Sequence, residues 1–328
     1  MMTSSVEVLF SILDETAHII QEELSITYLE AVAESAENLF HDGVLQDELS
    51  DLSKKRLDKK YHEVTLEQFH VEEIRKSYQL AILKGMKENV QSNHQMTPDS
   101  IGLMMSYLIG KFFSGKRSFS ILDPAVGTGN LLSTILNGLA PIEIQATGVE
   151  VDDLLIKLAY SGANLQKQQV QFFNQDSIEG LFIDPVDAVI CDLPVGYYPN
   201  DVRAAEYELK AEEGHSYAHH LLIEQSIKHT VPGGYLFFLI PNGLFSTEYS
   251  EQLHLFLKEH AQIQGILQLP LSMFSSEQAA KSIFILQKNE PNIKAPKQVL
   301  LADLPKLSNH HAMENMLVKL EQWFKENK

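Results

Sequence analysis

The sequence predicts an α/β fold built on a parallel sheet and preceded by a helical region. An apolar segment ends at Asp123, a loop with Gly127 and Gly129 follows, and an apolar pattern with helical spacing comes next. From about residue 117, short apolar β-rich segments alternate with helical ones, which is typical of a parallel sheet covered on both faces. Residues 1 to about 90 show only the helical period and almost no glycine or proline.

Composition limits the class of protein. The chain has 328 residues and 44% hydrophobic residues, enough for one large domain or two ordinary domains with a real core. It lacks a long apolar span and a secretory leader pattern, and its single cysteine, Cys191, fits a reducing compartment, so we expect a cytoplasmic protein. The net charge of −18 argues against tight DNA binding by this chain alone, but not against a local basic cleft or a basic partner subunit.

The N-terminal helical region is expected to end in a linker near Gln91–Gln95. The next segment begins with Thr97-Pro98, and Thr97 or Asp99 is a suitable N-cap for the helix that follows.

The remaining elements follow from the hydrophobic pattern. Strands are expected at 119–123, 144–149, 169–173, 186–191, 234–240, 263–268 and 282–287. Helices are expected near 129–138, 152–163, 216–229 and 248–259. The connection between the last two strands has no clear helix, so we expect these strands to form an antiparallel pair at one edge of the sheet. The tail from about residue 290 contains one amphipathic helix, which we expect to pack on the body of the protein.

The glycine loop differs from both common phosphate-binding fingerprints. It has no third glycine of the dinucleotide type, and no Gly-Lys-Ser/Thr that would hold a triphosphate. A loop of this kind at the first strand-to-helix turn still presents backbone to a nucleotide-like ligand. We therefore expect a nucleoside without a phosphate chain.

Acidic side chains follow four of the expected strands where each one ends. They are Asp123, Glu150, Asp176 and Asp192. The ligand of an open parallel sheet lies beyond the carboxyl ends of the strands. There Glu150 can accept hydrogen bonds from ribose hydroxyls, and Asp176 from an adenine amino group. Each residue alone is equally well a helix N-cap or a solvated loop residue, but the four together behind a glycine loop predict a binding site.

The order of these motifs resembles that of the amino-group DNA methyltransferases, and most of all the modification subunits of type I restriction systems. The motifs are Thr97-Pro98, Asp123–Gly129, Glu150, Asp176, Asp192-Leu193-Pro194-Val195, Val231–Gly234, Leu239–Phe245, Ile266–Pro270, Met273-Phe274 and Lys281–Leu286, and they span about residues 94 to 288. The resemblance implies a Rossmann-like methyltransferase with a seven-stranded, mostly parallel sheet whose last strand is antiparallel. It also implies S-adenosylmethionine as cofactor and adenine N6 as the usual target. The chain is similar in this way to a small stand-alone bacterial relative of those subunits.

The resemblance also implies a role for individual residues at the cofactor. Asp123 and the Ala125–Gly129 backbone would hold the methionine part, Glu150 the ribose, and Asp176 the adenine amino group. The full cofactor-binding set that it implies is Thr97, Pro98, Asp123, Pro124, Ala125, Gly127, Thr128, Gly129, Asn130, Glu150, Val151, Asp176 and Ser177.

On the acceptor side, Asp192 and the carbonyl of Leu193 would accept hydrogen bonds from the target amino group. The family's tetrad is Asn or Asp, then Pro-Pro, then an aromatic residue, whereas here Leu193 replaces the first proline and Val195 the aromatic ring. Base–aromatic stacking contributes on the order of 1–3 kcal/mol, so its loss weakens base binding by roughly 5- to 150-fold. Tyr197 and Tyr198 are the candidates to supply the ring, and the expected catalytic set is Asp192, Leu193, Pro194, Tyr197 and Tyr198.

These observations divide the chain into a helical N-terminal domain (1–92), an S-adenosylmethionine-binding methyltransferase domain (93–290) and a C-terminal helical extension (291–328). The extension is too short to be a recognition domain of ordinary size, so sequence-specific reading of DNA needs a partner or does not occur. A symmetric dimer through the N-terminal helices is compatible with the sequence, although no residue requires one.

Three functions are consistent with this pattern. The first is an adenine-specific DNA methyltransferase, which the intact cofactor motifs favour. The second is a cofactor-binding scaffold or regulator without catalysis, which the altered tetrad and the acidic charge favour. The third is a methyltransferase for RNA or for a protein glutamine.

His215, His219 and His220 have helical spacing, but no Cys or His-Glu pair completes a ligand set, so we expect no metal.

Overall fold

The computed structural model divides the chain into two compact units. It describes residues 4–88, 96–246, 248–291, 293–306 and 308–328. The first unit comprises Met1–Gly102, Val126–Ala140 and Glu150–Asn174, and the second comprises Leu103–Ala125, Pro141–Val149 and Gln175–Lys328. The first unit therefore combines the N-terminal helices with two segments of the α/β region. The expected linker at 91–95 lies outside the described residues.

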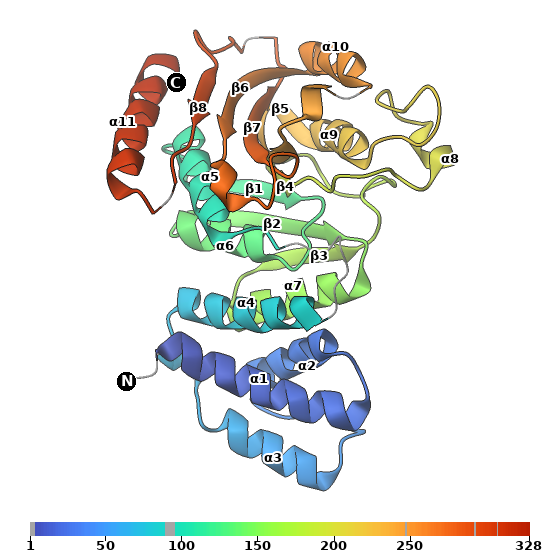
Figure 1. Cartoon of the computed structure of the whole chain (residues 1–328), viewed down its shortest axis with the longest axis vertical. Coiled ribbons are helices and arrows are strands. Elements are labelled where there is room, and N and C mark those ends of the chain that lie inside the picture. The colour runs from blue at the N-terminus through green and yellow to red at the C-terminus, as the bar shows by residue number, and fades with distance from the viewer. Residues whose placement is uncertain (1–3, 89–95, 247, 292, 307) are drawn as a thin grey trace. The chain divides into compact units, whose positions relative to one another are not determined.

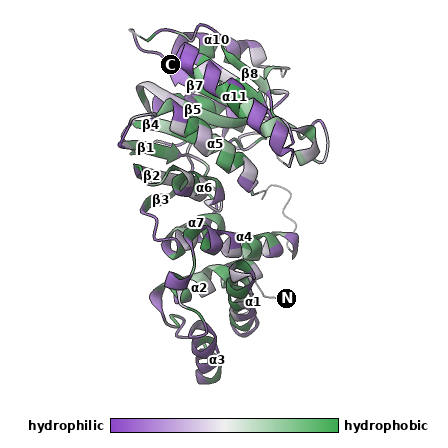
Figure 2. Ribbon diagram, turned by 90° about the vertical axis from the view of Figure 1, so that its left-hand side faces the viewer, coloured by the Kyte–Doolittle hydropathy of each residue, from purple (hydrophilic) through white to green (hydrophobic). Residues whose placement is uncertain are grey.

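The N-terminal part of the first unit is helical, as predicted. Its helices are α1 (Ser5–Leu24), α2 (Tyr28–His41), α3 (Asp51–Tyr61), the short 3₁₀ helix η1 (Leu66–Gln68) and α4 (Val71–Glu88) (Figure 1). Ser4 is the N-cap of α1, and Thr27 is the N-cap of α2. Each forms a capping box, in which it exchanges hydrogen bonds with the glutamate three residues later. The polar sequence of α3 makes it largely purple in Figure 2.

The core of the first unit joins these helices to α7 (Asp153–Leu165). Buried apolar side chains of α1, α2 and α4 form one cluster with Leu155, Leu158 and Leu165 of α7. Helix α6 (Asn130–Leu139) and strand β3 (Val170–Asn174) complete this unit. The N-terminal helices therefore bury their apolar faces partly on an element of the α/β region.

Helix α4 approaches α2 closely at Gly85. A Cβ atom added there would lie 2.6 Å from Cδ2 of Leu29 and 2.8 Å from Cδ1 of Tyr28. Glycine inside a helix costs about 1 kcal/mol relative to alanine, so the close approach is the physical reason for glycine at this position.

A mixed sheet of eight strands forms the framework of the α/β region, and it confirms the predicted α/β class. Its other strands are β1 (Ser118–Asp123), β2 (Glu143–Glu150), β4 (Val186–Asp192), β5 (Thr230–Pro241), β6 (Ala261–Gln268), β7 (Lys281–Lys288) and β8 (Leu300–Asp303). The strand order is β3-β2-β1-β4-β5-β7-β6-β8. Strands β1, β2, β4 and β5 pair in parallel, and β7 is antiparallel to both β5 and β6.

The expected antiparallel pair is present, but its expected place at the edge is wrong, and so is the number of strands. Strand β7 lies between β5 and β6, and an eighth strand, β8, pairs in parallel with β6 beyond it. Strand β8 has only four residues with mixed burial, which is too short for its period to be recognised in the sequence. The pair β6–β7 is therefore interior to the sheet.

The remaining helices of the second unit are α8 (Asp201–Ala204), α9 (Ala218–Lys228), α10 (Ser250–His260) and α11 (His310–Asn327). Helix α9 packs on β5, and α10 packs on β6. Helix α5 (Asp99–Phe112) ends in this unit, and Figure 2 shows it largely green. The rings of Trp323 and Phe324 in α11 contact Phe112, and Trp323 Nε1 donates to the carbonyl of Gln298 at 2.7 Å. The tail helix thus packs on the body of its unit, as expected. Within the described parts of the chain, none of the helices has the length and apolarity to cross a membrane.

We predict that Gly85→Ala lowers stability although alanine is the better helix former. The new methyl group must displace Leu29 or Tyr28, and overpacking of this kind costs about 1–3 kcal/mol. Urea unfolding followed by circular dichroism measures the change. Gly43→Ala is the matched control, because nothing lies within 4 Å of its added Cβ. A Gly85→Ala protein as stable as wild type would contradict this account of the packing.

Candidate functional site

The four carboxylates of the predicted site stand at or just beyond strand ends. Asp123 is the last residue of β1, Glu150 of β2 and Asp192 of β4, and Asp176 follows β3 by two residues. In a parallel sheet these carboxyl ends are where ligands bind. Their placement therefore agrees with the predicted location, while the role of each side chain stays a prediction.

The glycine loop of the first unit depends on glycine at two positions. Gly127 has φ +55° and Gly129 has φ +78°, in the left-handed region that favours glycine. A Cβ on Gly129 would also lie 3.1 Å from Cβ of Ala159 in α7, whereas nothing lies within 4 Å of a Cβ on Gly127. Gly129 thus lets the loop pack on α7, and Gly127 leaves open space against the backbone.

Glu150 holds this loop through backbone hydrogen bonds. Its Oε2 accepts from the N–H of Gly127 at 2.9 Å, and its Oε1 accepts from the N–H groups of Val151 and Asp152 at 3.0 Å each. A carboxylate has about four lone-pair positions, so about one stays available for a further donor. Val151 is exposed and Thr128 is half-buried.

Thr97 and Asn130 meet in the first unit. Asn130 Nδ2 donates to the carbonyl of the buried Thr97 at 2.9 Å, while Pro98 is exposed. This contact joins the residue that follows the glycine loop to the segment that precedes α5.

In the second unit, Asp123 is only 1% exposed and its Oδ1 accepts from the N–H of Ala125 at 3.2 Å. The hydroxyl of Ser177 donates to the carbonyl of the buried Pro124 at 2.5 Å. The structure therefore brings the end of β1 together with the segment after β3.

Asp176 and Tyr198 are partners. The Tyr198 hydroxyl donates to Asp176 Oδ2 at 2.7 Å, and the N–H of Ile178 donates to Oδ1 at 2.8 Å. Burial, together with the bond to this carboxylate, raises the pKa of Tyr198 above its ordinary value. Tyr198 is thus buried and connects the loop that follows the Asp192–Val195 tetrad to Asp176.

The tetrad begins with a residue that is already ion-paired. Lys281 Nζ lies 2.5 Å from Oδ1 of the half-buried Asp192. Leu193 is buried and its N–H donates to the carbonyl of Leu239 at 3.2 Å, whereas Pro194 and Val195 are exposed. No role for Lys281 follows from the sequence alone. The signal is a lysine at the start of a buried strand, and it has meaning only once β7 is known to lie next to β5.

The loop after the tetrad lies against the residues that precede α9. Tyr197 pairs with Tyr217 as an antiparallel bridge, and their rings stack with centroids 5.1 Å apart at 16°. The N–H of Ala218 donates to the carbonyl of Gly196 at 2.9 Å. Tyr197 is 65% exposed. Of the two tyrosines proposed for base stacking, Tyr197 is therefore the one with an accessible ring.

Two histidines lie buried beside this tyrosine pair in the first turn of α9. His219 is 3% and His220 is 1% exposed, and both rings contact the ring of Tyr217. Within the described residues, neither ring nitrogen of His220 has a hydrogen-bond partner, nor has Nδ1 of His219. Burial lowers the pKa of His219 to about 4 and that of His220 to about 3. Both rings are thus neutral at pH 7.

His215 does not join them, because its Nδ1 pairs with Asp201 Oδ1 at 2.9 Å. Across the part of the chain that the structure describes, no group of three or more His, Cys, Asp or Glu side chains is arranged to hold a metal ion.

A mostly parallel sheet with carboxylates at its strand ends and a glycine turn after β1 defines a Rossmann-like α/β protein. The chain belongs to the N-6 DNA methylase family, whose family model matches residues 78–328. A second family model, the YtxK N-terminal helical domain, matches residues 7–86. The resemblance found in the motifs is therefore confirmed.

Similar proteins match over all or nearly all of the chain. The uncharacterized protein YtxK of Bacillus subtilis (strain 168) is 51% identical over 329 residues, covering 100% of both chains. A crystal structure from Listeria monocytogenes, provisionally described as a class I S-adenosylmethionine-dependent methyltransferase, is 50% identical with a TM-score of 0.91 and covers 98% of this chain and 99% of that one. A type I restriction-modification methyltransferase subunit from Streptococcus thermophilus shares the fold, with 17% identity, a TM-score of 0.64, and coverage of 96% and 74%.

We predict that the two buried histidines make the protein less stable below pH 6.5. Their pKa values are lowered in the folded state, so between about pH 6.5 and 4 the unfolded chain binds more protons and stability falls as the pH falls. Each histidine contributes a loss of about 1.4 kcal/mol one pH unit below its unfolded pKa. His220→Phe should therefore remove about half of the loss in unfolding free energy between pH 7.5 and 5.5, measured by urea titration. His215→Gln, at an exposed position, is the control, and equal pH dependence in all three proteins would refute the assignment.

Proposed function

We propose that this protein is an S-adenosylmethionine-dependent methyltransferase that acts on an exocyclic amino group, adenine N6 in DNA. The observation that carries the proposal is Asp192 at the carboxyl end of β4, heading the tetrad of a member of the N-6 DNA methylase family. As an enzyme, it belongs with the site-specific, adenine-specific DNA methyltransferases.

S-adenosylmethionine is the methyl donor. The residues present fit a nucleoside-type ligand: Gly127 leaves open space against its backbone, and Glu150 keeps about one acceptor position for a ribose hydroxyl. The residues proposed to hold it are Thr97, Pro98, Asp123, Pro124, Ala125, Gly127, Thr128, Gly129, Asn130, Glu150, Val151, Asp176 and Ser177. When bound, this cofactor supplies an electrophilic methyl group.

The protein's contribution to the reaction is positioning and electrostatics. Asp192 and the carbonyl of Leu193 accept hydrogen bonds from the target amino group and draw its lone pair out of conjugation. Lys281 balances the charge of Asp192, so the pair presents a neutral acceptor, as the asparagine used elsewhere in the family does. Lys281 is thus a positioning residue, because it acts through Asp192.

Tyr197 is the proposed base-stacking residue in place of the aromatic ring that the tetrad lacks. Its ring is exposed and is held in orientation by stacking on Tyr217. Tyr198 has a different role in this proposal: it fixes Asp176, the residue assigned to the adenine of the cofactor.

DNA is the proposed substrate, reached with help from a partner. The segment that follows the tetrad carries Asp201, Glu206, Glu208, Glu212 and Glu213 against two cations, and one of these, Arg203, is paired with Glu206. A basic partner surface would supply the phosphate contacts that this segment lacks. The three-part division at 1–92, 93–290 and 291–328 is retained as the proposed domain organisation.

The second candidate is a cofactor-binding scaffold without catalysis. The ion pair on Asp192 and the exposed Val195 in place of an aromatic ring favour it. Both candidates bind the cofactor, but a scaffold leaves no methylated product, and this difference can be measured.

We predict new N6-methyladenine in the DNA of a host that lacks adenine methylation and expresses this chain. Mass spectrometry of nucleosides from both DNA and RNA measures the product. The mark should vanish with Asp192→Ala, because the acceptor of the amino protons is lost, while Asp303→Ala, an exposed acidic residue on the edge strand β8, should retain it. A mark in RNA alone would redirect the substrate, and no mark in either would favour the scaffold.

We predict that Tyr197→Ala reduces methylation by roughly 5- to 150-fold through loss of base stacking. Tyr197→Phe should retain activity, because it keeps the ring. Val202→Ala is the control, since Val202 is also exposed in the same segment but is not aromatic. Steady-state methylation of an adenine-containing duplex with tritiated cofactor measures the rates. Unchanged activity of Tyr197→Ala would remove Tyr197 from the site.

A further inference from the structure

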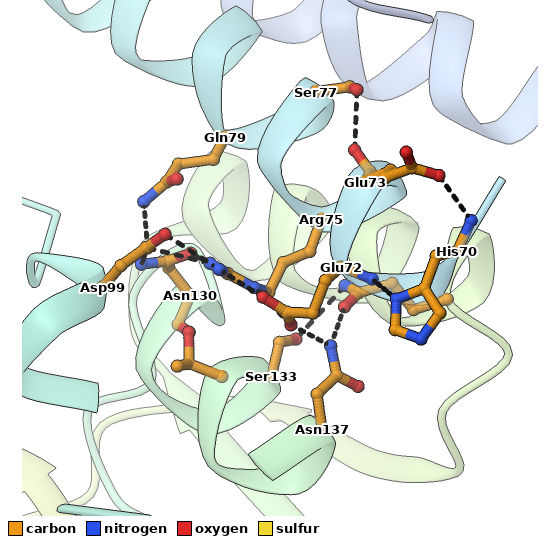
Figure 3. A network of polar contacts seen from close by, with 12 residues as sticks. His70, Glu72, Glu73, Arg75, Ser77, Gln79, Asp99, Asn130, Ser133 and Asn137 are labelled. Atoms are coloured by element: carbon orange, nitrogen blue, oxygen red, sulfur yellow. Dashed lines mark hydrogen bonds and ion pairs between the residues drawn. The ribbon is translucent and has the colours of Figure 1, made fainter. Parts of the chain in front are cut away.

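Arg75 in α4 lies at the centre of a buried polar network (Figure 3). Its side chain is 3% exposed. Nε and Nη2 donate to the two oxygens of Glu72 at 2.9 Å each, and Nη1 and Nη2 donate to the two oxygens of Asp99 at 2.8 Å each. Nη1 also donates to Oδ1 of Asn130 at 2.9 Å. A guanidinium has five N–H donors, and all five are used.

Two of these partners belong to segments that the proposed function assigns to the cofactor. Asn130 follows Gly129 directly and begins α6, and its Nδ2 donates to the carbonyl of Thr97. Asp99 follows Thr97-Pro98 directly and begins α5. A single side chain therefore holds the end of the glycine loop and the Thr97–Asp99 segment at once.

The charges of the network favour this arrangement. Burial alone would disfavour the charged guanidinium, but the hydrogen bonds to Asp99 and Glu72 outweigh it and raise the pKa of Arg75 above its ordinary value. Burial would likewise raise the pKa of Asp99 and of Glu72, and the bonds to Arg75 lower both instead. All three groups are thus charged at neutral pH. A lysine keeps the charge but cannot reproduce two bidentate pairs.

We propose that Arg75 is a positioning residue for cofactor binding. It fixes the Gly129–Asn130 and Thr97–Asp99 segments in the conformation that receives the ligand, and the inference rests on the proposed function in taking these segments as the cofactor site. Arg75 lies inside the part matched by the helical-domain family model, at 7–86, and outside the methylase match, at 78–328. The N-terminal helical region thereby supplies a residue that orders the methyltransferase loop.

The test compares full-length variants at this network with a matched control on the same helix. Arg75→Lys keeps the positive charge but loses the two bidentate pairs. Asn130→Ala removes the bond that Arg75 makes to the end of the glycine loop, together with the bond from Asn130 to the Thr97 carbonyl. The control is Lys84→Met, because Lys84 is also in α4 and its ion pair with Asp14, at 2.6 Å, does not involve either segment. Calorimetric titration with S-adenosylhomocysteine and hydrogen exchange of the ligand-free amides at residues 127–132 are measured, together with the melting temperature.

Arg75→Lys should weaken S-adenosylhomocysteine binding by about tenfold or more and speed amide exchange at 127–132, with Lys84→Met unchanged in both. The effects of Arg75→Lys and Asn130→Ala should be less than additive in the double variant, because both break the same link. Should Arg75→Lys prove too unstable, Asn130→Ala alone must show faster exchange in the loop.

Wild-type affinity and exchange rates in Arg75→Lys would overturn the proposal, and so would equal losses in Lys84→Met. If the wild-type chain binds neither S-adenosylmethionine nor S-adenosylhomocysteine, the proposed function fails. The exchange comparison in the ligand-free protein still decides whether Arg75 orders the loop.

Discussion

The packing of the N-terminal helices on α7 is the constraint on which the first unit depends. Leu155 and Leu158 of α7 lie in the same apolar core as α1, α2 and α4, and the Tyr78 hydroxyl donates to the carbonyl of Leu158 at 3.2 Å. Gly162 of α7 admits the ring of Tyr78, because a Cβ there would lie 2.9 Å from it. Helix α7 is also the element on which Gly129 rests. The glycine loop therefore packs on a helix whose own position depends on the core formed with the N-terminal helices.

The same packing explains why the charged side chain of Arg75 can be buried at this position. A guanidinium buried without partners would be very unfavourable, so its position is tolerable only where carboxylates and an amide already surround it. Helix α4 places it there because Gly85 and Tyr78, on the same helix, fix the helix against α2 and α7. The apolar contacts determine where α4 lies, and the polar network determines which loop conformation is compatible with that place.

Much of this architecture could be predicted from the sequence, because buried apolar residues recur with a period of about two in strands and about 3.6 in helices. Each of the seven expected strands is present, and Asp123, Glu150 and Asp192 end theirs. What the period does not report is which strands are neighbours. The contact of Lys281 with Asp192 joins residues 89 apart, and that of Arg75 with Asn130 joins residues 55 apart. Both depend on tertiary packing, and so does the position of β7 between β5 and β6.

The cations near the tetrad already have partners, and this limits how they could bind a phosphate group. Binding of nucleic acid draws its affinity largely from lysines and arginines that neutralise phosphates. After the tetrad, Arg203 is already bound to Glu206 and to the carbonyl of Ile178, Lys210 donates to the carbonyl of Ala205, and Lys281 is paired with Asp192. A phosphate would have to compete with these partners and with the neighbouring acidic groups. In the proposed function, a basic partner surface would supply the phosphate contacts and would leave the Asp192–Lys281 pair as it is.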